Sequence, residues 1–231
     1  MLFRSAVRAA VTVYPAPAGY PANPRFAVTF DGTPAHVYNA AVADRQPWQR
    51  YPAPVLQRTV GFAGCDTEGP VAVRIEVLGD GPRSVRVRPA SRSIAARLQG
   101  RTIAFTAPRP DNLIVELNDD YFDHLYLFLN PPETDRPDPA DPRVTWFGPG
   151  VHEAGQIDAT QDRQTIYLAG GAVVNGFIRA ENLNGLTIRG RGILCGTGQA
   201  RGSYLIRPRQ CTNVDRKSTR LNSSHRIRTR M

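Results

Sequence analysis

T-I-Y-L-A-G-G-A-V-V-N-G-F-I at residues 165–178 is the main evidence for the fold predicted for the second half of the chain. Short apolar runs alternate here with single glycine and asparagine residues, and the turns follow too quickly for hairpins of ordinary length. This pattern is typical of a parallel β-solenoid, in which each strand stacks on its equivalent one coil away and Gly or Asn occupies the left-handed corners. Residues 144–152 and 186–194 show the same pattern.

The spacing of these runs indicates the length of one coil. Thr165 to Leu186 spans a coil of about 21 residues, and N-G-L-T-I at 184–188 recurs in part as C-T-N-V at 211–214. We therefore predict that residues 143–214 form the first coils of a solenoid.

Residues 6–130 follow a different pattern. V-A-V-R-I-E-V-L at 71–78 and S-V-R-V-R at 84–88 alternate apolar and polar residues, as half-buried antiparallel strands do. Between them, G-D-G at 79–81 supplies the positive-φ positions of a tight hairpin, so we expect these two strands to pair. Further strands are predicted at 25–30, 102–106, 112–117 and 124–129. Their spacing of about ten residues favours a β-sandwich, and no segment has a convincing helical period.

Residues 131–142, P-P-E-T-D-R-P-D-P-A-D-P, separate the two patterns. Five prolines make this segment stiff and exclude it from a sheet interior, so we predict a linker. The carboxylates of Asp135, Asp138 and Asp141 lie in it without the glycine at the sharp turn of a calcium loop. We expect them to be solvated and predict no metal site.

The two ends of the chain look unlike the rest. Asp215 to His225 resembles, residue for residue, the translation of a common short-read sequencing adapter, and residues 1–5 resemble its complementary strand. We therefore treat residues 1–5 and 215–231 as adapter-derived, and residues 6–214 as an N-terminal piece of a longer protein whose true N-terminus is missing.

Leaving out these ends changes the electrostatics. They carry seven basic residues and one acidic residue, so the net charge falls from +9 to +3, and the chain's single lysine, Lys217, is among them. A nucleic-acid partner is therefore not expected. No run of about twenty apolar residues indicates a membrane span. Cys65, Cys195 and Cys211 are widely spaced and in no metal-ligand pattern, so we expect buried or half-buried thiols.

A family resemblance carries the functional prediction. F-G-P-G-V-H at 147–152, I-Y-L-A-G-G-A-V-V-N-G-F-I at 166–178 and I-R-G-R-G-I-L-C-G at 188–196 resemble the first coils of right-handed β-helix glycoside hydrolases. The polygalacturonase-like family, family 28, and the related dextranase group are of this kind. In bacterial members a β-sandwich precedes the helix, the order predicted here. One departure is Cys195, where the family often has aspartate or serine.

The resemblance implies a polysaccharide substrate and an inverting hydrolysis by two carboxylates, with no cofactor. The family's catalytic aspartates lie on coils that would follow Val214, so no catalytic residue is assigned here, and the chain alone is expected to be inactive. The resemblance also implies a secreted or periplasmic parent, which we expect to be a monomer. Two alternatives stay open: a β-helix lyase or epimerase, and a non-enzymatic carbohydrate-binding or adhesin-like solenoid.

Arg189 and Arg191 are the only substrate-binding candidates. They alternate along one predicted strand, and paired arginines recognise carboxylates such as those of uronic acids. An exposed structural face is the alternative. The remaining polar and aromatic candidates have ordinary structural explanations in turns, corners or packing; they are Asp119, Asp120, Asp123, His124, Trp146, His152 and Tyr167.

Overall fold

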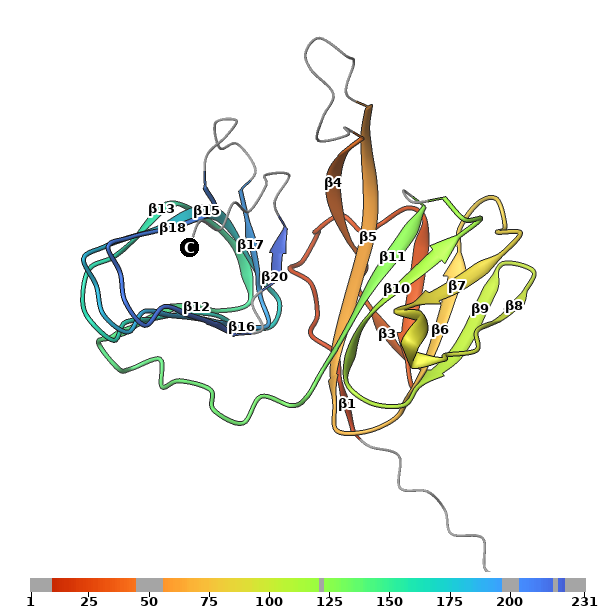
Figure 1. The fold of residues 1–231 in the computed structure, drawn as a ribbon, viewed down its shortest axis with the longest axis horizontal. Helices are drawn as coiled ribbons and strands as arrows, with labels where there is room; N and C mark the ends of the chain where they lie inside the picture. Colours follow the sequence, from red (N-terminus) through yellow and green to blue (C-terminus); the bar gives the residue numbers. More distant parts are fainter. Residues whose placement is uncertain (1–9, 45–55, 121–122, 197–203, 218–219, 223–231) are drawn as a thin grey trace, which may run out of the picture. The chain divides into compact units, whose positions relative to one another are not determined.

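The computed structural model describes residues 10–44, 56–120, 123–196, 204–217 and 220–222 (Figure 1). The chain divides into two compact units. The first comprises Met1–Tyr14 and Pro21–Glu133, and the second comprises Pro15–Tyr20 and Thr134–Met231. The described residues form β-strands and one 3-10 turn at Ala90–Arg92, with no α-helix, so the all-β prediction is confirmed. No helix in this part of the chain has the length and apolar character needed to span a bilayer.

Two sheets make up the first unit. One has the order β1-β5-β11-β10-β7 with β4 also paired to β5, and the other has the order β3-β2-β6-β9-β8. The strands of the first sheet are β1 Val11–Thr12, β4 Tyr38–Asp44, β5 Leu56–Thr67, β7 Val85–Arg88, β10 Asp111–Leu117 and β11 His124–Asn130. Those of the second are β2 Phe26–Phe30, β3 Thr33–Ala35, β6 Val71–Val77, β8 Arg97–Gln99 and β9 Thr102–Ala107.

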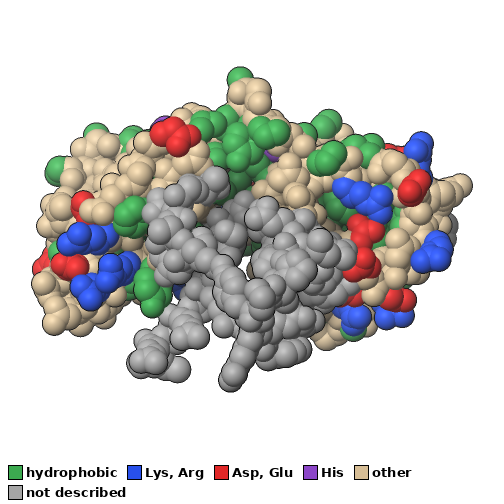
Figure 2. All heavy atoms as spheres, turned by 90° about the horizontal axis from the view of Figure 1, so that it is seen from above, with side chains coloured by type: hydrophobic (Ala, Val, Ile, Leu, Met, Phe, Trp, Pro, Cys, Tyr) green, Lys and Arg blue, Asp and Glu red, His purple; other side chains and the backbone are tan. Residues whose placement is uncertain are grey.

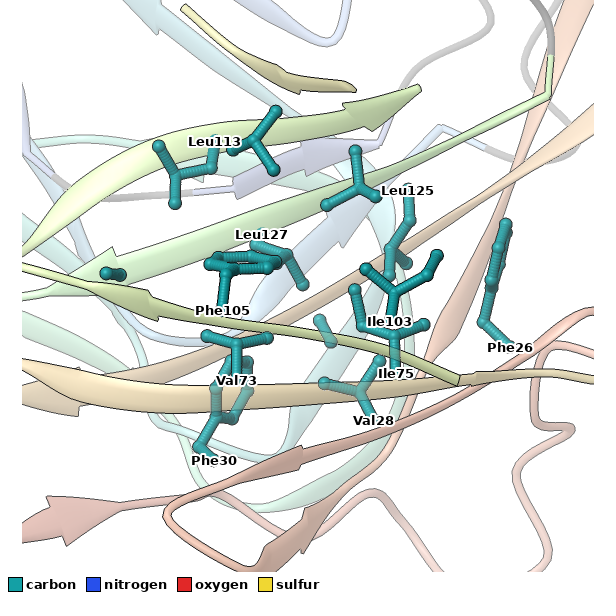
Figure 3. Close-up of a cluster of buried hydrophobic side chains, with 14 of the residues drawn as sticks. Phe26, Val28, Phe30, Val73, Ile75, Ile103, Phe105, Leu113, Leu125 and Leu127 are labelled. Carbon is teal, nitrogen blue, oxygen red and sulfur yellow. The ribbon is translucent and has the colours of Figure 1, made fainter. Parts of the chain in front are cut away.

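The apolar faces of these two sheets share one core (Figure 3). Along β6, residues 71, 73, 75 and 77 are buried, as the alternation predicted. Leu113, Leu125 and Leu127 meet them from the other sheet. Burial of alternate side chains is therefore the main force that joins the sheets.

The predicted pairing of 71–78 with 84–88 is wrong. β6 pairs with β2 and β9, whereas β7 pairs with β10 in the other sheet. Gly79, at φ +84°, lies in a connection between sheets and not in a hairpin turn. Both strands have an apolar face, and the core accepts such a face from either sheet, so alternation alone did not fix the partner.

The long strand β5 was not predicted. β5 contains two glycines and several polar residues, yet it pairs with β1, β4 and β11. Its ladder with β11 is parallel, in a region for which only antiparallel strands were expected. Asp31 and Gly32 both have positive φ and form the turn that joins β2 to β3.

Parallel strands stack in the second unit, which Figure 1 shows along the stack. One ladder has the order β12-β14-β16-β19, formed by Val144–Phe147, Thr165–Leu168, Thr187–Gly190 and Asp215–Lys217. The other has the order β13-β15-β17-β20, with β18 also on β15, formed by Gly150–Ala159, Ala172–Glu181, Ile193–Cys195, Arg220–Asn222 and Ile206–Arg209.

Successive coils differ in length. Val144 pairs with Thr165, and Thr165 pairs with Thr187, so the first two coils are nearly equal in length. Thr187 pairs with Asp215, which makes the next coil longer than either. The first two coils match the predicted length, and the third does not because additional residues separate β17 from β18.

Left-handed residues mark the corners between strands. Arg163, Gly185 and Asn213 occupy the same corner on three coils, with φ of +60°, +87° and +53°. Asn182 and Gln210 form another such pair. The prediction of Gly or Asn at the corners is therefore confirmed for three of these five, and Arg163 and Gln210 show that longer side chains are also accommodated. Inside the coils the core contains Ile157, Ile166, Leu168, Val174, Ile178, Leu186, Ile188 and Leu194, among others.

The C-terminal segment that resembles an adapter is described in part. Residues 215–217 and 220–222 continue the two parallel ladders as β19 and β20. Residues 1–5 and the rest of 215–231 lie outside the described residues. The adapter origin of both ends stays a prediction.

Candidate functional site

One column of side chains lies on the outer face of the first ladder of coils. Trp146, Tyr167 and Arg189 are in register on β12, β14 and β16. The rings of Trp146 and Tyr167 stack with their centroids 4.4 Å apart and their planes at 23°. Tyr167 is only 1% exposed although it is not part of the coil core. Something outside the coil therefore covers this column.

The linker supplies that cover. Arg136 places its guanidinium carbon 4.7 Å from the centre of the Trp146 ring and 5.9 Å from that of Tyr167. Asp135 accepts hydrogen bonds from both terminal nitrogens of Arg189, at 2.6 Å for Nη1. The side chain of Arg189 is 13% exposed and that of Asp135 is 62% exposed. Two consecutive linker residues thus bind a column that runs across three coils, and we name these five residues the strap column.

Breaking the ion pair of the strap column should destabilise the second unit modestly. Asp135→Asn removes the charge that the Arg189 guanidinium faces, and we expect a loss of about 1 kcal/mol because Asp135 is largely solvated. Chemical unfolding followed by circular dichroism measures this. Asp138→Asn is the matched control, because Asp138 only accepts a turn hydrogen bond from the Ala140 amide, which asparagine can also accept. Equal stability of the two variants would contradict the proposed role of the pair.

The structure separates the two predicted sugar-binding arginines. Arg189 lies in β16 and binds Asp135, whereas Arg191 is half-buried beyond Gly190, the last residue of β16. The expectation that both lie on one strand is wrong, because Gly190 has φ +124° and ends the strand.

Asp141 belongs to the linker at residues 131–142. Hydrogen bonds from Arg143 hold the pKa of the Asp141 carboxyl below its ordinary value.

The acidic patch at 119–124 is not a paired-carboxylate site. Asp123 binds Arg25 at 2.7 Å in an ion pair with two hydrogen bonds, and Asp119 binds Arg86 at 3.2 Å. Asp119 has φ +56°, as expected for a turn. Each of these two carboxylates is matched by its own arginine, which agrees with the structural explanation of the patch.

His152 and the thiols also have structural surroundings. His152 lies in β13 and not at a coil corner, and its Nε2 atom is hydrogen-bonded to the backbone carbonyl oxygen of Gly148 at 2.7 Å. Cys65 and Cys195 are buried and Cys211 is half-buried. Burial raises the pKa of the Tyr20 phenol, and the neighbouring Cys195 raises it further.

In the described ranges no group of three or more His, Cys, Asp or Glu residues is placed to hold a metal ion.

Charged side chains gather on the outer face of the second ladder. Asp158 on β13, Arg179 on β15 and Arg207 on β18 are in register, and Glu181 is in register with Arg209. Figure 2 shows basic and acidic side chains close together on the second unit, which lies on its left. A hollow of about 270 Å³ is lined by Asp158, Ala159, Thr160, Arg179 and Glu181, and another of about 520 Å³ by Glu181, Arg209 and Gln210. We name Asp158, Arg179, Glu181, Arg207 and Arg209 the charged groove.

The charged groove was not predicted from the sequence, although the coil period holds for two of its residues. Asp158 and Arg179 are separated by one predicted coil length, so applying that period to charged residues would have placed them side by side. Arg179 and Arg207 are separated by more than one such length, because the third coil is longer. The period could not have predicted that second neighbour.

Comparison with known proteins supports the fold. The structure is similar to that of Dex49A from Penicillium minioluteum, with a TM-score of 0.66 and 13% sequence identity. The match covers 91% of this chain and 55% of Dex49A, so the chain spans about half the length of that protein. No protein-family model matches the sequence, and no curated protein matches it. At this low sequence identity the likeness shows that the chain shares the fold of the matched part of Dex49A.

Proposed function

We propose that this chain is the N-terminal part of a polysaccharide-degrading glycoside hydrolase of the polygalacturonase-like type. The observation that carries the proposal is the fold likeness to Dex49A over nearly the whole chain. It agrees with the sequence resemblance of residues 144–214 to the polygalacturonase-like and dextranase groups. The coverage of 55% of Dex49A is compatible with a longer parent protein.

The proposed architecture is a β-sandwich followed by the first coils of a right-handed parallel β-helix. The two sheets around one core in the first unit support the first part. The parallel ladders, whose first two coils have the predicted length, support the second part. Residues 131–142 would join the two and, through Asp135 and Arg136, fasten the first coils.

The chemistry proposed for the parent is hydrolysis with two carboxylates. One carboxylic acid protonates the leaving glycosidic oxygen, while a carboxylate across the sugar ring removes a proton from the attacking water. We place this pair on coils that follow Val214. No cofactor is needed for this reaction.

Arg189 and Arg191 remain the proposed contacts for an acidic sugar such as a uronic acid. The bidentate pair of Arg189 with Asp135 supports the chemistry, because it shows the guanidinium binding a carboxylate through both terminal nitrogens. A uronate carboxylate would replace Asp135 in that pair. We further propose that the parent is a secreted or periplasmic monomer.

Extending the reading frame tests the proposal. The source DNA is read past the codon of Val214, the longer protein is produced beside the 231-residue chain, and the reducing ends released from polygalacturonate and from dextran are measured. We expect hydrolysis by the longer protein and none by the shorter chain, because the catalytic carboxylates would lie downstream.

The products separate the rival classes. Unsaturated sugar ends would identify a lyase, and binding without turnover by the longer protein would identify a binding solenoid. Either result would overturn the hydrolase assignment. If independently prepared source DNA encodes the same residues 215–231, those residues are genuine and the adapter assignment is overturned.

A further inference from the structure

Two arginines of the charged groove are neighbours with the same charge. Arg179 and Arg207 are paired in the parallel ladder of β15 and β18, and both are exposed. Neighbouring strands lie about 4.8 Å apart, so side chains at paired positions are close. Like charges at such positions are destabilising. The pair therefore destabilises the folded chain unless a negatively charged group lies beside it.

The acidic residues nearby neutralise this pair only in part. Glu181 accepts a hydrogen bond from Arg179 at 3.4 Å and lies 3.6 Å from Arg209, both long for charge-assisted contacts. Both oxygens of Asp158 accept from the amide of Gln156 at 3.0 Å. Within the described part of the chain Arg207 forms no ion pair. Arg179 and Arg209 therefore share the carboxylate of Glu181, and no carboxylate of the described residues is paired with Arg207.

The groove is held on a rigid base. The residues between its charged positions, Ile157, Ala159, Ile178 and Ala180, are buried in the coil core, and Ile206 packs against that core. Every other residue therefore presents its side chain outward at a fixed spacing. The two hollows meet at Glu181, which lines both. This arrangement offers an open surface that runs from one coil to the next.

We propose that the charged groove binds an anionic polysaccharide, with a carboxylate or sulfate group seated between Arg179 and Arg207. The sugar hydroxyls would donate to Glu181 and Asp158 and accept from Gln156 and Gln210. A nucleic acid fits less well, because its ionised phosphates accept hydrogen bonds and cannot donate to Asp158 and Glu181, whereas sugar hydroxyls can. This site lies on the opposite ladder from Arg189 and does not depend on the parent being a hydrolase.

Titration calorimetry with the 231-residue chain tests the proposal. The probes are a galacturonate oligosaccharide, a sulfated dextran oligosaccharide, a neutral dextran oligosaccharide and a short single-stranded DNA. We expect the two anionic sugars to bind, the neutral sugar to bind at least about tenfold more weakly, and added salt to weaken binding. The relative affinity of carboxylate and sulfate probes identifies which anion the groove prefers.

Variants locate the site. Arg179→Ala with Arg207→Ala should lower the affinity for the anionic sugars by about tenfold or more. Arg97→Ala is the control for charge, because Arg97 is an exposed arginine on β8 of the first unit, and it should have little effect. The affinity of Arg189→Ala for the same sugars measures how much of the binding comes from the uronate site proposed above. Unchanged affinity in the double variant, no binding of either anionic sugar, or equal binding of DNA would each overturn the groove proposal, whatever the activity of the longer protein.

Discussion

Replacing Gly190 with alanine is expected to destabilise the second unit by about 4 kcal/mol or more. Gly190 has φ +124°, a conformation that costs alanine free energy on its own. A Cβ atom there would also overlap the Leu168 carbonyl oxygen and lie 2.7 Å from its carbonyl carbon. Leu168 is the partner of Gly190 in the parallel ladder, so this backbone cannot move without breaking the stack.

Chemical unfolding followed by circular dichroism, together with limited proteolysis of residues beyond 134, measures the loss. Gly79→Ala is the matched control, because Gly79 also has a positive φ, +84°, but an added Cβ would meet no atom within 4 Å. We expect that control to lose about 1 kcal/mol, from backbone conformation alone. Similar losses in the two variants would show that contact with Leu168 does not matter.

Tyr167→Ala is expected to cost about 3–5 kcal/mol, as truncations of buried aromatic residues do. Tyr167 is 1% exposed, stacks on Trp146 and lies beneath Arg136. The variant would leave a cavity between the linker and β14 and would remove one of the two rings that the guanidinium covers. Unfolding by denaturant, followed by circular dichroism, gives the free energy.

Two comparisons make this result specific. Tyr204→Ala should change stability by less than about 0.5 kcal/mol, because Tyr204 is 50% exposed. Tyr167→Ala combined with Asp135→Asn should cost less than the two single losses together, since both weaken the same strap column. Strict additivity would show that Tyr167 and Asp135 stabilise the coils independently.

The position of most strands could be predicted because their signal is local. Alternation along β6, β9 and β10 and short apolar runs between glycines in the coils depend on near neighbours in the sequence. The partners of those strands could not be predicted in the first unit. β6 and β7 have equivalent alternation but belong to different sheets.

The candidate site divides in the same way. Arg189 could be proposed from the sequence as a carboxylate-binding residue, because guanidinium groups bind carboxylates well. Its partner Asp135 could not, because it lies 54 residues away in the linker. Asp158 and Arg179 follow the predicted coil length, whereas Arg207 does not, because the coil that contains it is longer. Nothing in the local pattern around residue 167 indicated that the linker covers its ring.

Local periodicity was enough to predict the all-β character, the change of pattern at residues 131–142 and the length of the first coils, because each depends on near neighbours in the sequence. Other features follow only from the three-dimensional structure: which strands pair, how the linker buries Tyr167, and which charged side chains meet in the groove. These features depend on register between segments far apart in the sequence, and register is set by the packing of the whole core and not by any one segment.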